Sequence, residues 1–165
     1  MRRIFRAAVL VALIALPMGC EDPSGPESEG TFTAMWADEE WSGDGVASLI
    51  GNVLHIAGSK KQPGQDYTAE FVSFEITSPA VGTFSLGSGK ATYAELVGGD
   101  VYGALYRTTP EATGSVTITR YDGPGGLVEG FVSFDAELVA GSGTYGDRNR
   151  LEDGQFSVPV RQPLD

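Results

Sequence analysis

Apolar and polar residues alternate along most of the chain beyond residue 30. The alternation is clearest in two near-identical segments, 71–75 and 131–135, which both read Phe-Val-Ser-Phe followed by an acidic residue. Successive side chains of a β-strand point to opposite faces, so every second residue of such a segment faces the core. We therefore expect Phe74 and Phe134 to be buried, and the serine before each of them to face the other way.

Turn-forming residues separate these apolar runs at short intervals. Gly51 and Asn52 form a two-residue hairpin signal, and segments 38–40 and 122–126 mark further breaks. The pattern predicts about ten strands, at residues 31–37, 45–50, 53–59, 67–77, 82–86, 91–97, 101–107, 114–121, 128–139 and 153–160. Segment 91–97 is also compatible with a short helix. Many short strands with closely spaced turns predict an all-β fold, either a single antiparallel β-sandwich or a flattened β-barrel.

The chain begins with a basic and then an apolar segment. Arg2, Arg3 and Arg6 precede an uninterrupted apolar run over residues 7–16. This order is typical of a secretory signal peptide. The run is shorter than the roughly 20 apolar residues that a membrane-spanning helix needs. We therefore expect residues 1–19 to be a signal peptide that is removed during export.

Cys20 follows the apolar run directly and is the only cysteine of the chain. Gly19-Cys20 resembles the lipobox of bacterial lipoproteins, in which the cysteine is acylated, with palmitate among the attached chains, and becomes the mature N-terminus. The alternative is a free thiol beside an ordinary cleavage site, but no A-x-A pattern lies nearby. Residues 20–30, rich in Pro, Ser, Gly and Glu, are expected to be the anchor and a flexible tether, and residues 31–165 the β-domain.

Further segments are similar to a family of small bacterial lipoproteins with a polar tether and an all-β domain of unknown function. The shared motifs are Phe32-Thr33-Ala34 followed by Trp41, the strands 53–58, 114–119 and 130–134, and the acidic-Gly-x-Phe segment 153–158. This resemblance implies a lipid-anchored β-domain. It brings no activity, cofactor or site residue to this chain.

The chain is acidic, with 22 Asp and Glu against 11 Lys and Arg and a net charge of −11. The expected leader holds three of the arginines, so the exported part is more acidic still. Such a charge argues against nucleic acid as a partner and against electrostatic binding to anionic lipids. We expect secretion across the inner membrane and membrane contact through acylated Cys20, in the periplasm or on the cell surface, with a protein or carbohydrate partner still to be identified.

Three groups of residues have the chemistry of a catalytic or metal site. His55, the only histidine, lies mid-strand without a G-x-S-x-G nucleophile motif in the chain. Segment 38–40 and Asp44 form the densest acidic group, but neighbours in one turn point apart, whereas a glycosidase needs two facing carboxylates. Segment 147–154 offers oxygen ligands for calcium, but it also carries two arginines and departs from EF-hand spacing. We therefore expect no cofactor and no metal.

Aromatic residues are the remaining candidates for a binding site. Trp41 follows a turn and is expected at the rim of the fold, and together with Tyr102 and Tyr106 it forms the candidate ligand-binding set. The alternative is that rings on one strand face pack in the core. The sequence favours a lipid-anchored, non-catalytic binding or scaffolding domain. An envelope hydrolase that uses a carboxylate pair, and a barrel that encloses a small apolar ligand, remain alternatives.

Overall fold

The computed structural model describes residues 29–99 and 101–161, and this part of the chain is all-β. Its strands are β1 (Gly30–Trp36), β2 (Glu39–Ile50), β3 (Val53–Lys61), β4 (Thr68–Thr77), β5 (Gly82–Leu86), β6 (Ala91–Val97), β7 (Val101–Arg107), β8 (Gly114–Tyr121), β9 (Leu127–Gly141) and β10 (Arg148–Arg161). The predicted all-β fold is confirmed, and segment 91–97 is a strand. The expected signal peptide, Cys20 and most of the expected tether lie outside the described residues.

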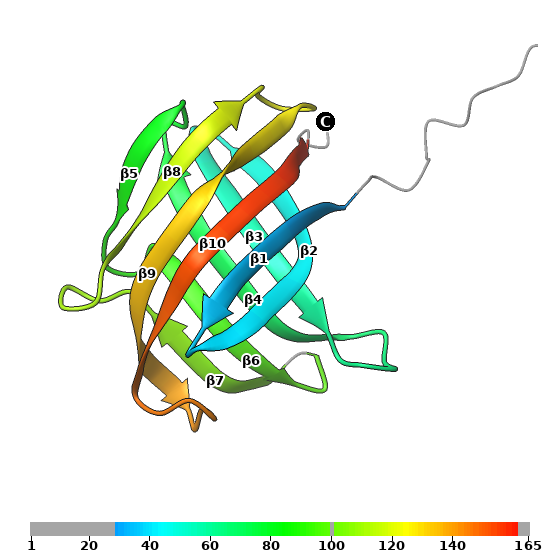
Figure 1. The fold of residues 1–165 in the computed structure, drawn as a ribbon, viewed down its shortest axis with the longest axis vertical. Coiled ribbons are helices and arrows are strands. Elements are labelled where there is room, and N and C mark those ends of the chain that lie inside the picture. The colour runs from blue at the N-terminus through cyan, green and yellow to red at the C-terminus, as the bar shows by residue number, and fades with distance from the viewer. Residues whose placement is uncertain (1–28, 100, 162–165) are drawn as a thin grey trace, which may run out of the picture.

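The strands form a closed ring (Figure 1). Antiparallel pairing runs from β1 through β2, β3, β4, β6, β7, β9 and β10, and β10 pairs back with β1. β8 pairs with β9, and β5 extends the sheet from β8. Figure 1 shows β9, β10 and β1 across the front, with β3 and β4 behind them. The architecture is therefore a flattened, irregular barrel with two facing walls.

β9 connects the two walls. One of its edges pairs with β10, while the other pairs with β8 over residues 128–134 and then with β7 over residues 137–141. The register against β7 shifts between Leu105 and Tyr106, as expected where a bulge lets a strand bend. A long amphipathic strand in this region is what the sequence pattern predicts.

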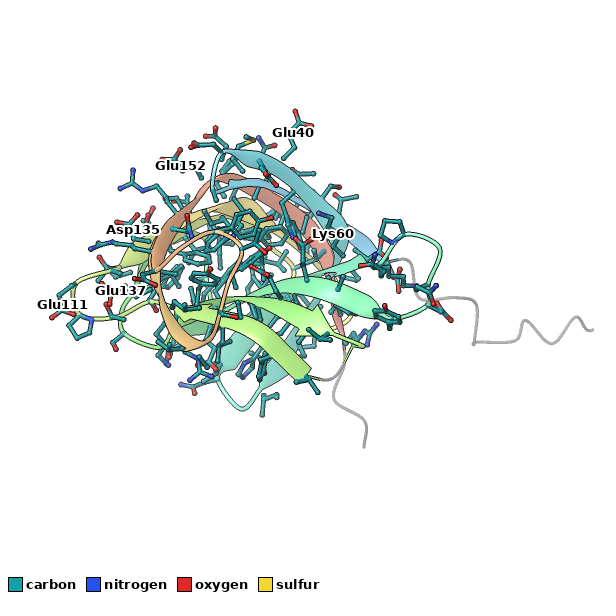
Figure 2. The ribbon with its side chains drawn as sticks, turned by 90° about the horizontal axis from the view of Figure 1, so that it is seen from below. Glu40, Lys60, Glu111, Asp135, Glu137 and Glu152 are labelled. Carbon is teal, nitrogen blue, oxygen red and sulfur yellow. The ribbon has the colours of Figure 1, made fainter. Side chains whose placement is uncertain are left out.

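Inward-facing side chains fill the ring. Phe74 and Phe134 are 1% and 2% exposed, and the serines before them lie on the outer face, so the predicted register is confirmed. The core is rich in aromatic rings that contact one another, and the rings of Trp36 and Tyr93 stack with centroids 4.0 Å apart. The view from below shows side chains occupying the space between the walls (Figure 2).

The first hairpin differs from its sequence prediction, and the difference places Trp41. The turn consists of Ala37 and Asp38, which both have positive φ (50° and 65°), the arrangement of a type I′ hairpin turn, rather than of segment 38–40. β2 begins directly after this turn, so Trp41 pairs with Ala34 and shares its inward face. Trp41 is 2% exposed, and the expectation that it lies at the rim is wrong.

Candidate ligand-binding groove

The wall formed by β1, β10, β9 and β8 carries a series of hollows on its outer face. Successive hollows have volumes of about 490, 550, 370 and 210 Å³. Neighbouring hollows share lining residues: Arg150 belongs to the first and second, Ser133 to the second and third, and Phe131 to the third and fourth. The hollows therefore adjoin one another in a line, and together we call them the outer groove.

Uncharged polar side chains surround a single phenylalanine in the middle of the outer groove. Strand pairing aligns Thr33 of β1, Gln155 of β10, Phe131 of β9 and Thr117 of β8 in one row across the wall. Phe131 is 52% exposed at the centre of this row. The described part of the chain offers no hydrogen-bond partner to the side chains of Thr33, Ser115, Ser133 and Gln155. These groups are therefore available to a ligand.

Arginines and carboxylates gather at one end of the outer groove. Arg150 contacts Asp135 through Nε at 2.5 Å and Glu152 through Nη1 at 3.1 Å. Arg148 lies 3.5 Å from Asp135 and 3.6 Å from Glu137. The hydrogen bond from Arg150, together with the charges of both arginines, lowers the pKa of Asp135, which is therefore ionised at neutral pH. Figure 2 shows Asp135, Glu137 and Glu152 on the outside of the ring.

This ionic cluster includes Arg148, Arg150 and Glu152 of segment 147–154, whose oxygen-bearing side chains the sequence suggests as calcium ligands. Most of that segment belongs to β10 rather than to a loop, and its arginines bind the carboxylates that would otherwise be free for a cation. Among the described residues, no group of three or more His, Cys, Asp or Glu side chains is placed to hold a metal ion.

A β-bulge in β10 adds a carboxylate to the outer groove. The register against β9 shifts between Leu151 and Gly154, and Asp153 has a φ of 50°. Glu152 and Asp153 are consequently both exposed, whereas regular alternation would expose one of them. Gly154 is buried, and a Cβ at this position would lie 2.5 Å from the Val132 carbonyl oxygen. Glycine is therefore required where the bulge rejoins the sheet.

Of the other candidates for chemistry, Asp38 lines the first hollow of the outer groove, whereas His55, Glu40 and Asp44 lie away from it. His55 is on the outer face of β3, 3.5 Å from Glu75 of β4, and Lys90 contacts the same carboxylate at 3.1 Å. Glu40 and Asp44 lie on the outer face of β2, four residues and therefore about 13 Å apart along the strand. That spacing is too long for the facing carboxylates of a glycosidase. Glu40 and Asp44 therefore do not form such a facing pair.

The structure separates the aromatic residues that the sequence suggested as ligand-binding. Tyr106 is fully buried, because it pairs with Tyr93 on the inward face of the ring, and the expectation of an exposed ring is wrong for it as for Trp41. Tyr102 is 49% exposed, but its ring lies 6.3 Å from Phe71 of β4, away from the outer groove. The three candidates therefore share no surface.

Three tyrosines, of which Tyr93 and Tyr106 are fully buried and Tyr145 is partly buried, lie together at one end of the ring. The Tyr93 hydroxyl donates a hydrogen bond to Glu70 at 2.8 Å, and burial together with the negative charge of Glu70 raises the pKa of Tyr93. Burial, with nearby Glu70 and Glu39, raises the pKa of Tyr145 to about 12. Burial and the charge of Glu95 raise the pKa of Tyr106. Tyr93 and Tyr106 belong to the core, and Tyr145 packs against it.

The residues that line the outer groove left only a faint signal in the sequence. Phe131 occupies an outward position of its strand, next to inward Val132, so a large apolar residue stands where alternation calls for a polar one. The same is true of Phe71, and the sequence does not distinguish the two. Arg148 and Arg150 alternate with Leu151 on β10 and would identify an outward ionic face only once the strand pairing is known.

Comparison with known proteins found no matching family model, no matching curated protein and no matching solved structure. The described residues contain no helix that is long and apolar enough to cross a membrane.

Proposed function

We propose that this chain is a non-catalytic binding domain, held at a membrane of the cell envelope through acylated Cys20, that takes its ligand in the outer groove. The observation that carries the proposal is the groove along β9 and β10, in which the side chains of Thr33, Ser115, Ser133 and Gln155 have no hydrogen-bond partner within the described chain. Ligand sites are typically concave, with a few polar groups that fix the ligand's orientation.

The chemistry of the described residues favours binding over catalysis. Asp135 is held ionised by Arg150, so it is unsuited to act as a general acid at neutral pH. His55 contacts Glu75 on the opposite wall, and among the described residues it has no hydrogen bond to a hydroxyl group that it could activate as a nucleophile. Aromatic rings occupy the inside of the ring, so the alternative of an enclosed apolar ligand gains no support from the packing.

The proposed anchor rests on the leader and on Cys20. A basic start, a short apolar run and a cysteine directly after it have the order of a lipoprotein signal peptide. A single acyl chain binds membranes only marginally, whereas two or more hold stably. Intact mass of the detergent-extracted mature protein tests this part: we expect an N-terminal, acylated Cys20, and an unmodified cysteine contradicts the anchor. The Cys20→Ser chain should lose its lipid or remain unprocessed.

The role of the outer groove is tested by complementing a deletion strain. The variant Phe131→Ala, combined with Gln155→Ala, removes the exposed ring and the adjacent amide without touching the core. We expect this double variant to lose the cellular phenotype while it folds normally. The matched control is Phe71→Ala, which changes the corresponding residue of the near-identical segment on β4. Full complementation by the double variant contradicts a binding role for the groove.

A further inference from the structure

We propose that the ligand of the outer groove is an uncharged polysaccharide chain. This inference rests on the proposed binding function and names its ligand class. The groove is elongated, because its hollows follow one another along β9, from Asp135 to Glu129, and along β10, from Arg148 to Ser157. An extended polymer fits such a shape, whereas a compact small molecule would occupy one hollow.

The row at the centre of the groove matches the surface of a sugar ring. A pyranose has an apolar face of C–H groups and a rim of hydroxyls. The exposed Phe131 ring offers an apolar platform, and Gln155 and Thr117 flank it on the neighbouring strands. The Gln155 amide has no partner within the described chain, whereas the Thr117 hydroxyl shares one hydrogen bond with that of Thr83 at 2.9 Å. An amide and a hydroxyl each both donate and accept hydrogen bonds, as the hydroxyl rim of a sugar requires.

Hydroxyl-bearing residues also form the cross-strand rows on either side of the row that contains Phe131. Ser115 and Ser133 face each other across β8 and β9 on one side of Phe131, and neither side chain has a partner within the described chain. Thr31 and Ser157 pair across β1 and β10 on the other side, where Ser157 donates to Glu129 at 2.9 Å. Hydroxyl groups thus recur from strand to strand, which suits a repeating ligand.

The charge distribution around the groove favours an uncharged polysaccharide over an anionic one. Acidic side chains flank Phe131 on both sides: Glu129 lines one of the two hollows that Phe131 shares, and Asp153 lines the other, with the ionic cluster around Asp135 beyond it. The chain as a whole carries a net charge of −11. Like charges brought together across an interface are unfavourable, so a polyanion is disfavoured.

A protein partner fits the groove less well. Stable protein interfaces are anchored by a cluster of apolar and aromatic residues that is shielded by a polar rim. At the centre of the outer groove, the ring of Phe131 is the single large apolar side chain that is exposed, and polar residues lie on both sides of it. The groove therefore has no apolar cluster of the kind that anchors a protein partner.

Calorimetric titration of the full lipidated chain tests the ligand class, in a detergent without a sugar headgroup. The probes are three neutral hexasaccharides, cellohexaose, maltohexaose and N-acetylchitohexaose, with hexagalacturonate as the anionic comparison. We expect at least one neutral probe to bind with a Kd of about 1 mM or tighter, and hexagalacturonate to bind more weakly. Phe131→Ala should weaken that binding by about tenfold, and Gln155→Ala by about threefold, whereas Phe71→Ala should leave it unchanged.

Three results would overturn the inference: no binding by any neutral probe, tighter binding of hexagalacturonate, or equal affinities for the Phe131→Ala and unmodified chains. Failure of the ligand class is distinguishable from failure of the binding function. If the probes do not bind but the double variant fails to complement the deletion strain, the groove is a binding site for another ligand.

Discussion

Truncation of Phe134 is the strongest single perturbation that the fold predicts. The side chain is 2% exposed, its ring centroid lies 6.3 Å from that of Trp36, and it belongs to β9, which connects both walls of the ring. A buried Phe→Ala change typically costs 3–5 kcal/mol, through lost burial and the cavity that remains. Because the free energy of unfolding of a domain is about 5–15 kcal/mol, Phe134→Ala removes a large share of it.

Urea unfolding measures this loss, and the buried indoles of Trp36 and Trp41 supply the fluorescence signal. With a slope of about 2 kcal/mol per molar urea, the midpoint should fall by about 2 M. The matched control is Ser133→Ala, one residue earlier on the exposed face, which should cost less than about 0.5 kcal/mol. Equal losses for the two variants would refute the register of β9, because a slip of one residue exchanges the two faces of a strand.

Three further perturbations follow from the contacts described above. Gly154→Ala places a Cβ 2.5 Å from the Val132 carbonyl oxygen and should lower the free energy of unfolding by about 1–3 kcal/mol, whereas Gly87→Ala, with open space around it, should be nearly neutral in the same urea assay. Asp135 has a lowered pKa, so its bonds to Arg150 stabilise the fold above its ordinary pKa of 3.8, and this stabilisation is lost as the pH falls through the lowered pKa. The unmodified chain should therefore be more stable than Asp135→Asn by up to about 1 kcal/mol at neutral pH, and this difference should vanish in acid. A difference that stays constant with pH would contradict the pairing of Asp135 with Arg150. In an alkaline titration followed by tyrosinate absorbance, Tyr145 should ionise near pH 12 and Tyr93 only when the chain unfolds, so Tyr93→Phe should leave the absorbance of the folded protein unchanged below that pH.

The strands were predictable because their pattern is local, whereas the groove depends on which strands meet. Alternation places Phe74 and Phe134 inward whatever their neighbours are, and the structure agrees. Trp41 was misplaced because the hairpin turn at Ala37 and Asp38 lacks glycine, so the sequence did not reveal where pairing begins. Such a turn is set by the pairing of the whole hairpin, which local composition does not encode.

The sequence alone does not predict the candidate site, for a related reason. Thr33, Phe131 and Gln155 come from three strands that are distant in the chain and align only once the ring has closed. The bulge at Asp153 changes the outward face of β10 by one residue, and alternation alone has no means to locate it. Outward phenylalanines were visible in both near-identical segments, but only the structure shows that one of them lies in a concavity.

Labelling of a cysteine placed in the outer groove tests most directly whether the groove holds a ligand in the cell. Cys20 is the only native cysteine, and acylation would block its thiol, so Ser133→Cys introduces the one reactive group while it keeps Phe131 and Gln155 in place. Ile50→Cys is the control, since Ile50 is also exposed, at the β2–β3 turn, and does not line the groove. We expect maleimide to react more slowly with Ser133→Cys in intact cell envelopes than in the purified chain, and at the same rate in both settings with Ile50→Cys. Equal rates in both settings for Ser133→Cys would contradict the assignment of the outer groove as the binding site.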